Sequence, residues 1–409
     1  MSEMENRTQI LRKRCLERKT LIGAWDSDPR LVARSWKNTE DISSWAIRRG
    51  MLTHDLLAWT ELALDDLELL VGRLAPDCPE WKAERETARE YLSIHAPHIY
   101  TPGQSGHCQL DLSRLLAVGV GQLGKEIEQA ARGFEGAQQE TLQAFLIALT
   151  GLQRMAENAA EAAQQAGTSA QGSRRAELVE MAAACRHIAF APPATFREAL
   201  QLAYLAILGC QVADRAWLVS PGHLDRILWP FYQADLAAGR ITPEMALLLI
   251  EGLYVLLNEN IPDGLAVSVM VGGRDEQGRD LTNPLSYLCL EALRRTKLVY
   301  PTVGICWHPG TPDDLVALAI DLIAQGCPNP AFFGDETIQR GLQLYGVPPQ
   351  ESWNYVNSTC VEITPVGSSN VWVASPYYST CKILVDEIAA QVQTGQPAET
   401  FAVFMDGYH

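Results

Sequence analysis

Residues 302–336 read TVGICWHPGTPDDLVALAIDLIAQGCPNPAFFGDE, and this stretch decides the fold. Its first part, TVGICWH, has the apolar, β-branched character of a buried strand. The segment from Thr311 to Gly326 opens with Thr-Pro, carries two aspartates in its first turn and stops at glycine, all of which are helix boundary signals. PAFFGDE then indicates a second short strand. A strand, a capped helix and another strand in this order predict a βαβ unit with parallel strands.

The same alternation continues outward from this stretch on both sides. The sequence predicts a helix over 242–260, a strand over 265–273, a helix over 283–297, a helix over 335–346 and a strand-like segment over 354–362. Active residues of such folds sit at the carboxyl ends of the strands and in the loops beyond them. We therefore expect an α/β fold, in which residues 220–409 supply the βα units.

Residues 1–219 have a different pattern, with helical spacing of apolar residues almost throughout. The predicted helices cover 54–72, 124–166 (as one or two helices), 172–188 and 193–211, the last of them apolar enough to be central. A loop rich in Pro, Gly and His is expected over 95–111. This part is predicted to be mainly helical.

Composition excludes several classes of function. The 409 residues carry a formal net charge of −16, which argues against a nucleic-acid surface. The basic run at 11–19 is interpreted as a solvated helix face. No signal peptide or membrane span is visible, and ten scattered cysteines without a C-x-x-C pair indicate reduced thiols and no metal cluster. A cytoplasmic location is expected.

The segment NSTCVEITPVGSSN, residues 357–370, carries the candidate chemistry. Cys360 and Glu362 are two positions apart, so in an extended segment both side chains face one side. A cysteine hydrolase would need a histidine partner, for which His107, His223 and His308 are candidates. Metal ligation lacks a second ligand at suitable spacing, and a structural cysteine remains open at this point.

At these residues the sequence resembles a known family, the glycyl radical enzymes related to pyruvate formate-lyase. The resemblance covers some 300 residues. The segments that carry it include GHCQLDLSRLLAVG (106–119), PPATFREALQ (192–201), SPGHLDRILWPFYQADLAAGRITPEM (220–245), VGGRDEQGRDLTNPLSYLCLEA (271–292), HPGTPDDLVALAIDLIAQGCPNPAFFGDE (308–336) and STCVEITP (358–365).

The resemblance implies a fold and a mechanism. Residues 220–409 would form the first half of a glycyl-radical-enzyme type α/β barrel. Cys360 would form a thiyl radical that abstracts hydrogen from a small organic substrate, and Glu362 would act as general base. The family further implies no metal, a glycyl radical installed by a radical S-adenosylmethionine activase, and a homo-oligomer.

Some positions depart from the family's patterns. Two adjacent cysteines, typical of formate-lyases proper, are absent at Cys360. Trp372 is followed by Val-Ala where diol and choline lyases typically carry His-Asp, and RAWLVSP (215–221) replaces a more polar stretch. The pocket is therefore expected to be more apolar than a polyol site. An arylacetate-like acid undergoing decarboxylation and a diverged dehydratase remain equal alternatives.

Other pocket candidates have structural alternatives of equal weight. Phe333, beside Phe332, is a candidate wall of the barrel interior or a core residue. Trp372 is a candidate pocket wall or core residue, and His107 matches a family histidine or makes a structural hydrogen bond. The GGRDEQGRD segment at 272–280 is interpreted as a polar turn and not as a phosphate site.

The glycine-bearing signature of the family, of the Arg-Val-x-Gly-Tyr kind, is not found in the sequence. Residues 397–409 are predicted to begin an amphipathic helix, and we expect the chain to be truncated there. Two hypotheses follow. Either a glycyl-radical-domain polypeptide or missing segment completes a lyase, or the chain is a truncated or partner-dependent subunit without activity of its own.

Overall fold

The computed structural model describes residues 3–19, 28–75, 78–99, 106–261, 267–327, 329–357, 362–367, 380–395 and 398–408. The chain divides into two compact units, Met1–Trp372 and Val373–His409, each described by itself.

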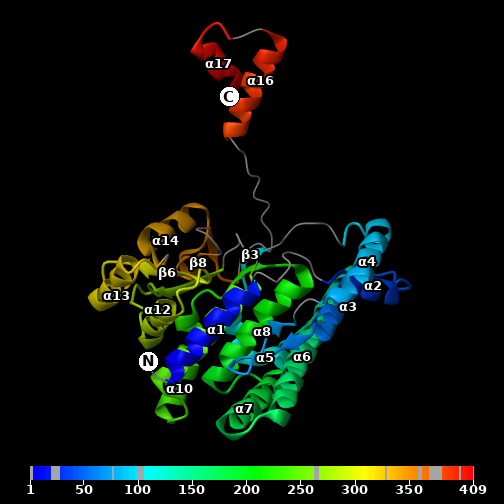
Figure 1. Ribbon diagram of the computed structural model, residues 1–409, viewed down its shortest axis with the longest axis vertical. Coiled ribbons are helices and arrows are strands. Elements are labelled where there is room, and N and C mark those ends of the chain that lie inside the picture. The colour runs from blue at the N-terminus through cyan, green and yellow to red at the C-terminus, as the bar shows by residue number, and fades with distance from the viewer. Residues whose placement is uncertain are drawn as a thin grey trace. The chain divides into compact units, whose positions relative to one another are not determined.

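The first unit begins with a helical part and continues with strands and helices in alternation (Figure 1). Its helices are α1 (Glu3–Lys19), α2 (Pro29–Asn38), α3 (Trp45–Trp59), η1 (Pro79–Trp81), α4 (Lys82–His95), α5 (Leu112–Ala131), α6 (Gly136–Ser169), α7 (Gly172–Ile188), α8 (Phe196–Asp214), α9 (Leu224–Ile227), α10 (Trp229–Ala237), α11 (Pro243–Asn260), α12 (Pro284–Thr296), α13 (Asp313–Ala324), α14 (Asp335–Leu344) and α15 (Pro349–Ser352). Its strands are β1 (Leu62–Ala63), β2 (Arg73–Leu74), β3 (Gly106–Gln109), β4 (Leu218–Ser220), β5 (Ser268–Gly272), β6 (Thr302–Trp307), β7 (Ala331–Gly334), β8 (Tyr355–Asn357) and β9 (Ile363–Pro365). The second unit contains α16 (Thr380–Thr394) and α17 (Phe401–Tyr408), so the helix predicted near the end of the sequence is confirmed.

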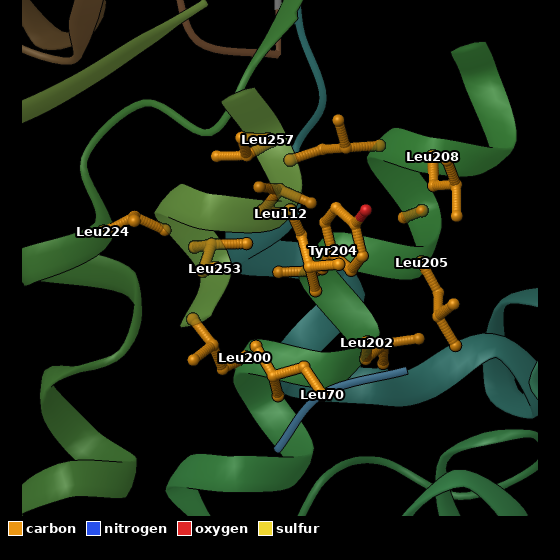
Figure 2. Close-up of a cluster of buried hydrophobic side chains, with 14 of the residues drawn as sticks. Leu70, Leu112, Leu200, Leu202, Tyr204, Leu205, Leu208, Leu224, Leu253 and Leu257 are labelled. Atoms are coloured by element: carbon orange, nitrogen blue, oxygen red, sulfur yellow. The ribbon is translucent and has the colours of Figure 1, made fainter. Parts of the chain in front are cut away.

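The predicted central helix is confirmed as α8, and it is buried on almost all sides. Figure 2 shows Tyr204 of α8 among leucines of its own helix and of α11, together with Leu70, Leu112 and Leu224. A helix that is apolar all round is stable only inside a core, because no face suits water. The hydroxyl of Tyr204 donates a hydrogen bond to the carbonyl oxygen of Gly72 at 3.0 Å, which satisfies its polar end.

The helix predicted over 54–72 is only partly correct. Helix α3 ends at Trp59, and the following residues form β1 and a turn. Two acidic side chains explain the difference. Asp65 Oδ1 accepts from the backbone N–H of Leu67 at 3.2 Å, and Glu68 Oε2 accepts from the backbone N–H of Asp65 at 2.6 Å. These carboxylates accept hydrogen bonds from backbone N–H groups that would otherwise bind carbonyl oxygens of a helix.

The basic run at 11–19 forms the end of α1, as expected, but its interpretation as a solvated face is partly wrong. Cys15 is fully buried and Leu11 is 4% exposed. The Arg18 guanidinium binds both carboxylate oxygens of Glu259, each at 2.8 Å, and Asp65 Oδ2 at 2.8 Å. The run therefore docks through both an apolar contact, in which Leu11 and Cys15 pack with Val255 and Leu298, and charge-assisted hydrogen bonds to acidic groups.

Residues 268–334 contain a parallel sheet, as the βαβ pattern predicted. Strands β5, β6 and β7 pair in that order, with Val271 opposite Ile305 and Ile305 opposite Phe332. Strands β3 and β4 are also parallel, and a parallel bridge between Gly222 and Val269 links the chain after β4 to β5. The pairings therefore align parallel segments in the order β3, β4, β5, β6, β7.

The segment predicted as a strand over 354–362 differs from expectation. Strand β8 covers Tyr355–Asn357 and pairs with β9 as an antiparallel hairpin. The two strands pair antiparallel because only five residues connect them, whereas a parallel crossover needs a dozen or more.

Seven cysteines are free thiols among the described residues, and five of them are buried, which agrees with the expected reduced core cysteines. Within those residues no helix is both long and apolar enough to cross a bilayer, and no cluster of metal-ligating side chains is found.

Candidate functional site

The candidate site is built around the β8–β9 hairpin. Asn357 pairs with Ile363, so residues 358–362 form the connection between the two strands. Cys360 belongs to this connection and lies outside the described residues. Glu362 is described, exposed, and immediately precedes β9. The two residues of the Cys-x-Glu motif thus occur in the turn of a hairpin, and whether their side chains face one way remains a prediction.

The hairpin packs on the parallel sheet through a small apolar cluster. Tyr355 and Val356 of β8 are fully buried there against Met270 of β5 and Cys306 of β6. Phe333 of β7 packs against the same cluster and is half-buried. This cluster therefore packs β8 against the sheet.

Close packing at this place depends on one glycine. A Cβ atom on Gly304 of β6 would lie 2.6 Å from Met270 Sδ and 2.7 Å from Phe333 Cε2. These separations are shorter than side chains tolerate, so glycine at this position allows the side chains of Met270 and Phe333 to approach the backbone of β6 closely.

Two hydrogen bonds attach β8 to the surrounding elements. His223 is 3% exposed, and its Nε2 lies 2.8 Å from the carbonyl oxygen of Tyr355. The Tyr355 hydroxyl donates to Asp335 Oδ1 at 3.0 Å, and burial raises its pKa above the ordinary value. Arg274 Nε donates to the other oxygen of Asp335 at 2.9 Å, so this buried carboxylate is paired.

Asp225 lies beside His223 and is fully buried. Its Oδ2 accepts from the backbone N–H of Gly272 at 2.8 Å and from the Ser286 hydroxyl at 2.7 Å. Burial raises its pKa to about 6, although the positive charge of Arg226 and these hydrogen bonds act in the opposite direction. Burial also lowers the pKa of His223 well below its ordinary value, and Arg226 adds to this effect. The imidazole is therefore neutral.

The structure brings only some of the predicted site residues together. Phe333 lies at the hairpin. His107 lies in β3, with its side chain outside the described part, and Trp372 lies outside the described residues altogether. His308 is engaged elsewhere, with Nε2 3.0 Å from Asp280 Oδ1 and Nδ1 accepting from the backbone N–H of Gly310.

Three residues at the hairpin were not predicted from sequence, namely Tyr355, Asp335 and Asp225. Each occurs inside or beside a segment that carries the family resemblance, yet nothing in the sequence pairs them.

The polar turn expected at 272–280 is confirmed. Asp275 Oδ1 accepts from the backbone N–H groups of Gln277 and Arg279, each at 2.9 Å.

Comparison with known proteins agrees with this architecture. A family model described as "Pyruvate formate lyase-like" matches residues 78–393. The (2S)-3-sulfopropanediol dehydratase of Klebsiella oxytoca is 30% identical over 71% of this chain and 38% of its own length. The indoleacetate decarboxylase of Tractidigestivibacter scatoligenes is 28% identical over 65% of this chain and 32% of its own length.

Solved structures show the same fold. A structure described as 1,2-propanediol dehydration in Roseburia inulinivorans has a TM-score of 0.85 and 21% identity, covering 97% of this chain and 60% of that chain. The B12-independent glycerol dehydratase from Clostridium butyricum has a TM-score of 0.84 and 20% identity, covering 98% of this chain and 61% of that chain. The α/β barrel type expected from the resemblance is confirmed.

The chain spans less than half of the length of the curated relatives named above. The match to the family model nevertheless covers most of the chain, including the parallel sheet and both strands of the hairpin. The chain belongs to the pyruvate formate lyase-like family of glycyl radical enzymes.

Proposed function

We propose that this chain is the thiol-bearing part of a glycyl radical lyase that acts on a small organic substrate in the cytoplasm of an anaerobic cell. The observation that supports it is the β8–β9 hairpin. Its first strand packs against the parallel sheet through the cluster of Tyr355, Val356 and Met270, and the connection between its two strands contains Cys360 and Glu362.

In this proposal Cys360 exchanges a hydrogen atom with the substrate, and Glu362 removes a proton from it. A glycyl radical, installed by a radical S-adenosylmethionine activase, supplies the hydrogen-atom acceptor that makes the thiol reactive. The turn of a hairpin suits the two residues because both can reach one substrate carbon region, as a general base must. His107, Phe333 and Trp372 are proposed to line the substrate site.

The reaction is proposed to be a dehydration or a decarboxylation. The names of the relatives include a sulfopropanediol dehydratase, a trans-4-hydroxy-L-proline dehydratase and an indoleacetate decarboxylase. The proposed mechanism suits both reaction classes, because loss of a hydrogen atom from the substrate weakens the neighbouring bond while Glu362 removes a proton. A substrate panel should therefore contain both vicinal diols and arylacetates.

A cysteine hydrolase is disfavoured by the described histidines. His223 Nε2 lies against the Tyr355 carbonyl, and His308 lies against Asp280 and the Gly310 amide. A hydrolase needs an imidazole within hydrogen-bond reach of the thiol, oriented by a third group. Nε2 of His223 and both ring nitrogens of His308 are thus occupied by structural partners.

The edge of β7 supports a requirement for further polypeptide. In the part of the chain that the structure describes, β7 pairs with β6 alone. Phe332 of β7 is 41% exposed and Trp307 at the end of β6 is 42% exposed. Exposed strand edges with aromatic side chains favour association. We propose that a segment bearing the glycyl radical joins here, and that the chain alone is inactive.

The test is anaerobic reconstitution of the chain with the glycine-bearing polypeptide and the activase, assayed on the substrate panel. Turnover is expected only in the complete mixture. Cys360→Ala is expected to abolish it, and Glu362→Gln to lower kcat by about 10²- to 10⁴-fold, the usual contribution of a general base.

A matched control is Cys78→Ala, which removes a free thiol distant in sequence from the hairpin and should leave turnover unchanged. Ester or amide hydrolysis by the chain alone in air would overturn the proposal. So would full activity of Cys360→Ala in the reconstituted mixture.

A further inference from the structure

The first strand of the hairpin has an unusual attachment. Within the described residues, β9 is the strand with which β8 pairs, and β8 does not join the parallel sheet. Outside the hairpin, its attachment includes two side-chain hydrogen bonds, both at Tyr355. His223 binds the Tyr355 carbonyl oxygen at 2.8 Å, and the Tyr355 hydroxyl binds Asp335 at 3.0 Å.

We propose that His223 is a positioning residue for the thiol loop, residues 358–361, because its imidazole fixes the backbone of Tyr355 in β8, the strand that precedes this loop in the chain. This inference rests on the proposed role of Cys360. The carbonyl that His223 binds lies three residues before that loop and five before the thiol. A hydrogen bond to the backbone here restrains the strand that precedes the loop, and supporting contacts of this kind hold functional groups in place.

The tautomer of His223 follows from its partners. A carbonyl oxygen only accepts, so Nε2 carries the hydrogen in this contact. Nδ1 then carries a lone pair. This atom is buried, has no hydrogen-bond partner among the described residues, and lies 3.9 Å from Asp225 Oδ1, which has none either.

Asp225 lies beside the imidazole but makes no hydrogen bond to it. Its other oxygen is fixed by the Gly272 amide at the end of β5 and by Ser286 in the first turn of α12. The restriction on β8 therefore comes from the hydrogen bond that the buried His223 imidazole donates to the Tyr355 carbonyl oxygen.

The test compares three variants of the full chain. His223→Leu removes the donor and keeps an apolar side chain, whereas His223→Gln places an amide N–H within reach of the same carbonyl. His308→Leu is the matched control. His308 is also buried, at 4% exposure, and follows β6, but it makes hydrogen bonds to Asp280, Gly310 and Thr311.

Two readouts report on the hairpin without requiring enzymatic turnover. One is amide hydrogen exchange of the peptide that contains Val356 and Asn357. The other is the alkylation rate of Cys360, followed by peptide mass spectrometry. His223→Leu is expected to raise both rates by about five- to tenfold, which corresponds to one hydrogen bond of ordinary strength. His223→Gln is expected to stay within about threefold of the wild type, and His308→Leu to leave both rates unchanged.

Equal effects of His223→Leu and His223→Gln would overturn the proposal, because both rates would then depend on the shape of the side chain at position 223 and not on its N–H donor. Equal effects of His223→Leu and His308→Leu would also overturn it. If the leucine variant does not fold, long-range nitrogen-15 histidine spectra of the wild type decide. A His223 signal with the hydrogen on Nε2 supports the proposal, and one with it on Nδ1 overturns it.

The outcome is separable from that of the proposed function. Loosening of the hairpin in His223→Leu, together with an inert Cys360 in the reconstituted mixture, would refute the lyase and retain the positioning role. Cys360-dependent turnover in the reconstituted mixture, with exchange and alkylation rates unchanged in His223→Leu, would support the lyase and refute the positioning role.

Discussion

The free energy of unfolding is expected to fall as the pH rises from about 5 to about 8. Replacing Glu68 with glutamine is expected to remove much of this fall. Glu68 lies between β1 and β2 and is 3% exposed. Its Oε1 accepts from Arg73 Nε at 3.1 Å and its Oε2 from the Asp65 amide at 2.6 Å. Burial raises its pKa to about 7, and the negative charges of Asp65 and Glu259 add to the rise.

The magnitude follows from the two states of the carboxyl group. Its ordinary pKa is 4.5 and its pKa in the folded protein is about 7. Below the lower value both states are protonated and the group has no effect on stability. Between the two values only the unfolded state releases the proton, so the free energy of unfolding falls as the pH rises. Above the upper value the full loss, about 3 kcal/mol, has occurred.

The assay is urea unfolding at about pH 5.5 and about pH 8, followed by tryptophan fluorescence. Glu68→Gln should reduce the difference between the two pH values by about 2 kcal/mol. A smaller dependence should remain, because burial also raises the pKa of Glu251 to about 7. Glu128→Gln removes an exposed carboxylate of α5 and should behave as the wild type does.

The reasoning would be refuted by a wild type that is equally or more stable at the higher pH. It would also be refuted if Glu68→Gln kept the full pH difference. Either result would mean that the surrounding arginines hold the Glu68 carboxylate ionised.

Three further substitutions test the packing of the site and the core. Tyr355→Phe leaves Asp335 Oδ1 without its donor and should cost about 1–3 kcal/mol in urea unfolding, whereas Tyr345→Phe, at a 93% exposed position, should cost nothing. Gly304→Ala places a methyl group against the side chains between sheet and hairpin and should cost about 1–3 kcal/mol, with faster amide exchange in β8. Leu253→Ala, at a 2% exposed position, should lower the free energy of unfolding by about 2–5 kcal/mol; a loss below 1 kcal/mol would mean that the core collapses around the site.

Much of the fold could be predicted because the signals are local. Apolar spacing identified α7 and α8, and helix caps identified α11, α12 and α13. The Asn283 capping box and the Thr242 cap are both present in the structure. The prediction over 54–72 was wrong where acidic side chains bind backbone amides, since apolar spacing does not report such competition.

Less of the candidate site could be predicted. The Cys-x-Glu motif was visible as sequence. Phe333, singled out as a pocket wall or core residue, packs against the hairpin cluster, and its role in a substrate site stays a prediction. The hairpin was not foreseen, because its antiparallel pairing depends on how few residues separate β8 from β9. The roles of Tyr355 and Asp335 were hidden for another reason, since their contact joins residues 20 positions apart.

The sequence by itself determined the order of helices and strands, the parallel βαβ pattern and the family to which the chain belongs. These depend on periodicity, capping residues and ordered motifs, all of which are properties of neighbours along the chain. Only the tertiary structure decided that the basic end of α1 docks on buried carboxylates, and that His223, Asp225 and Tyr355 meet at the thiol hairpin. His223 and Tyr355 are 132 positions apart, and no local signal specifies such a contact. It arises only when the sheet and the hairpin pack together and leave a buried carbonyl that needs a donor.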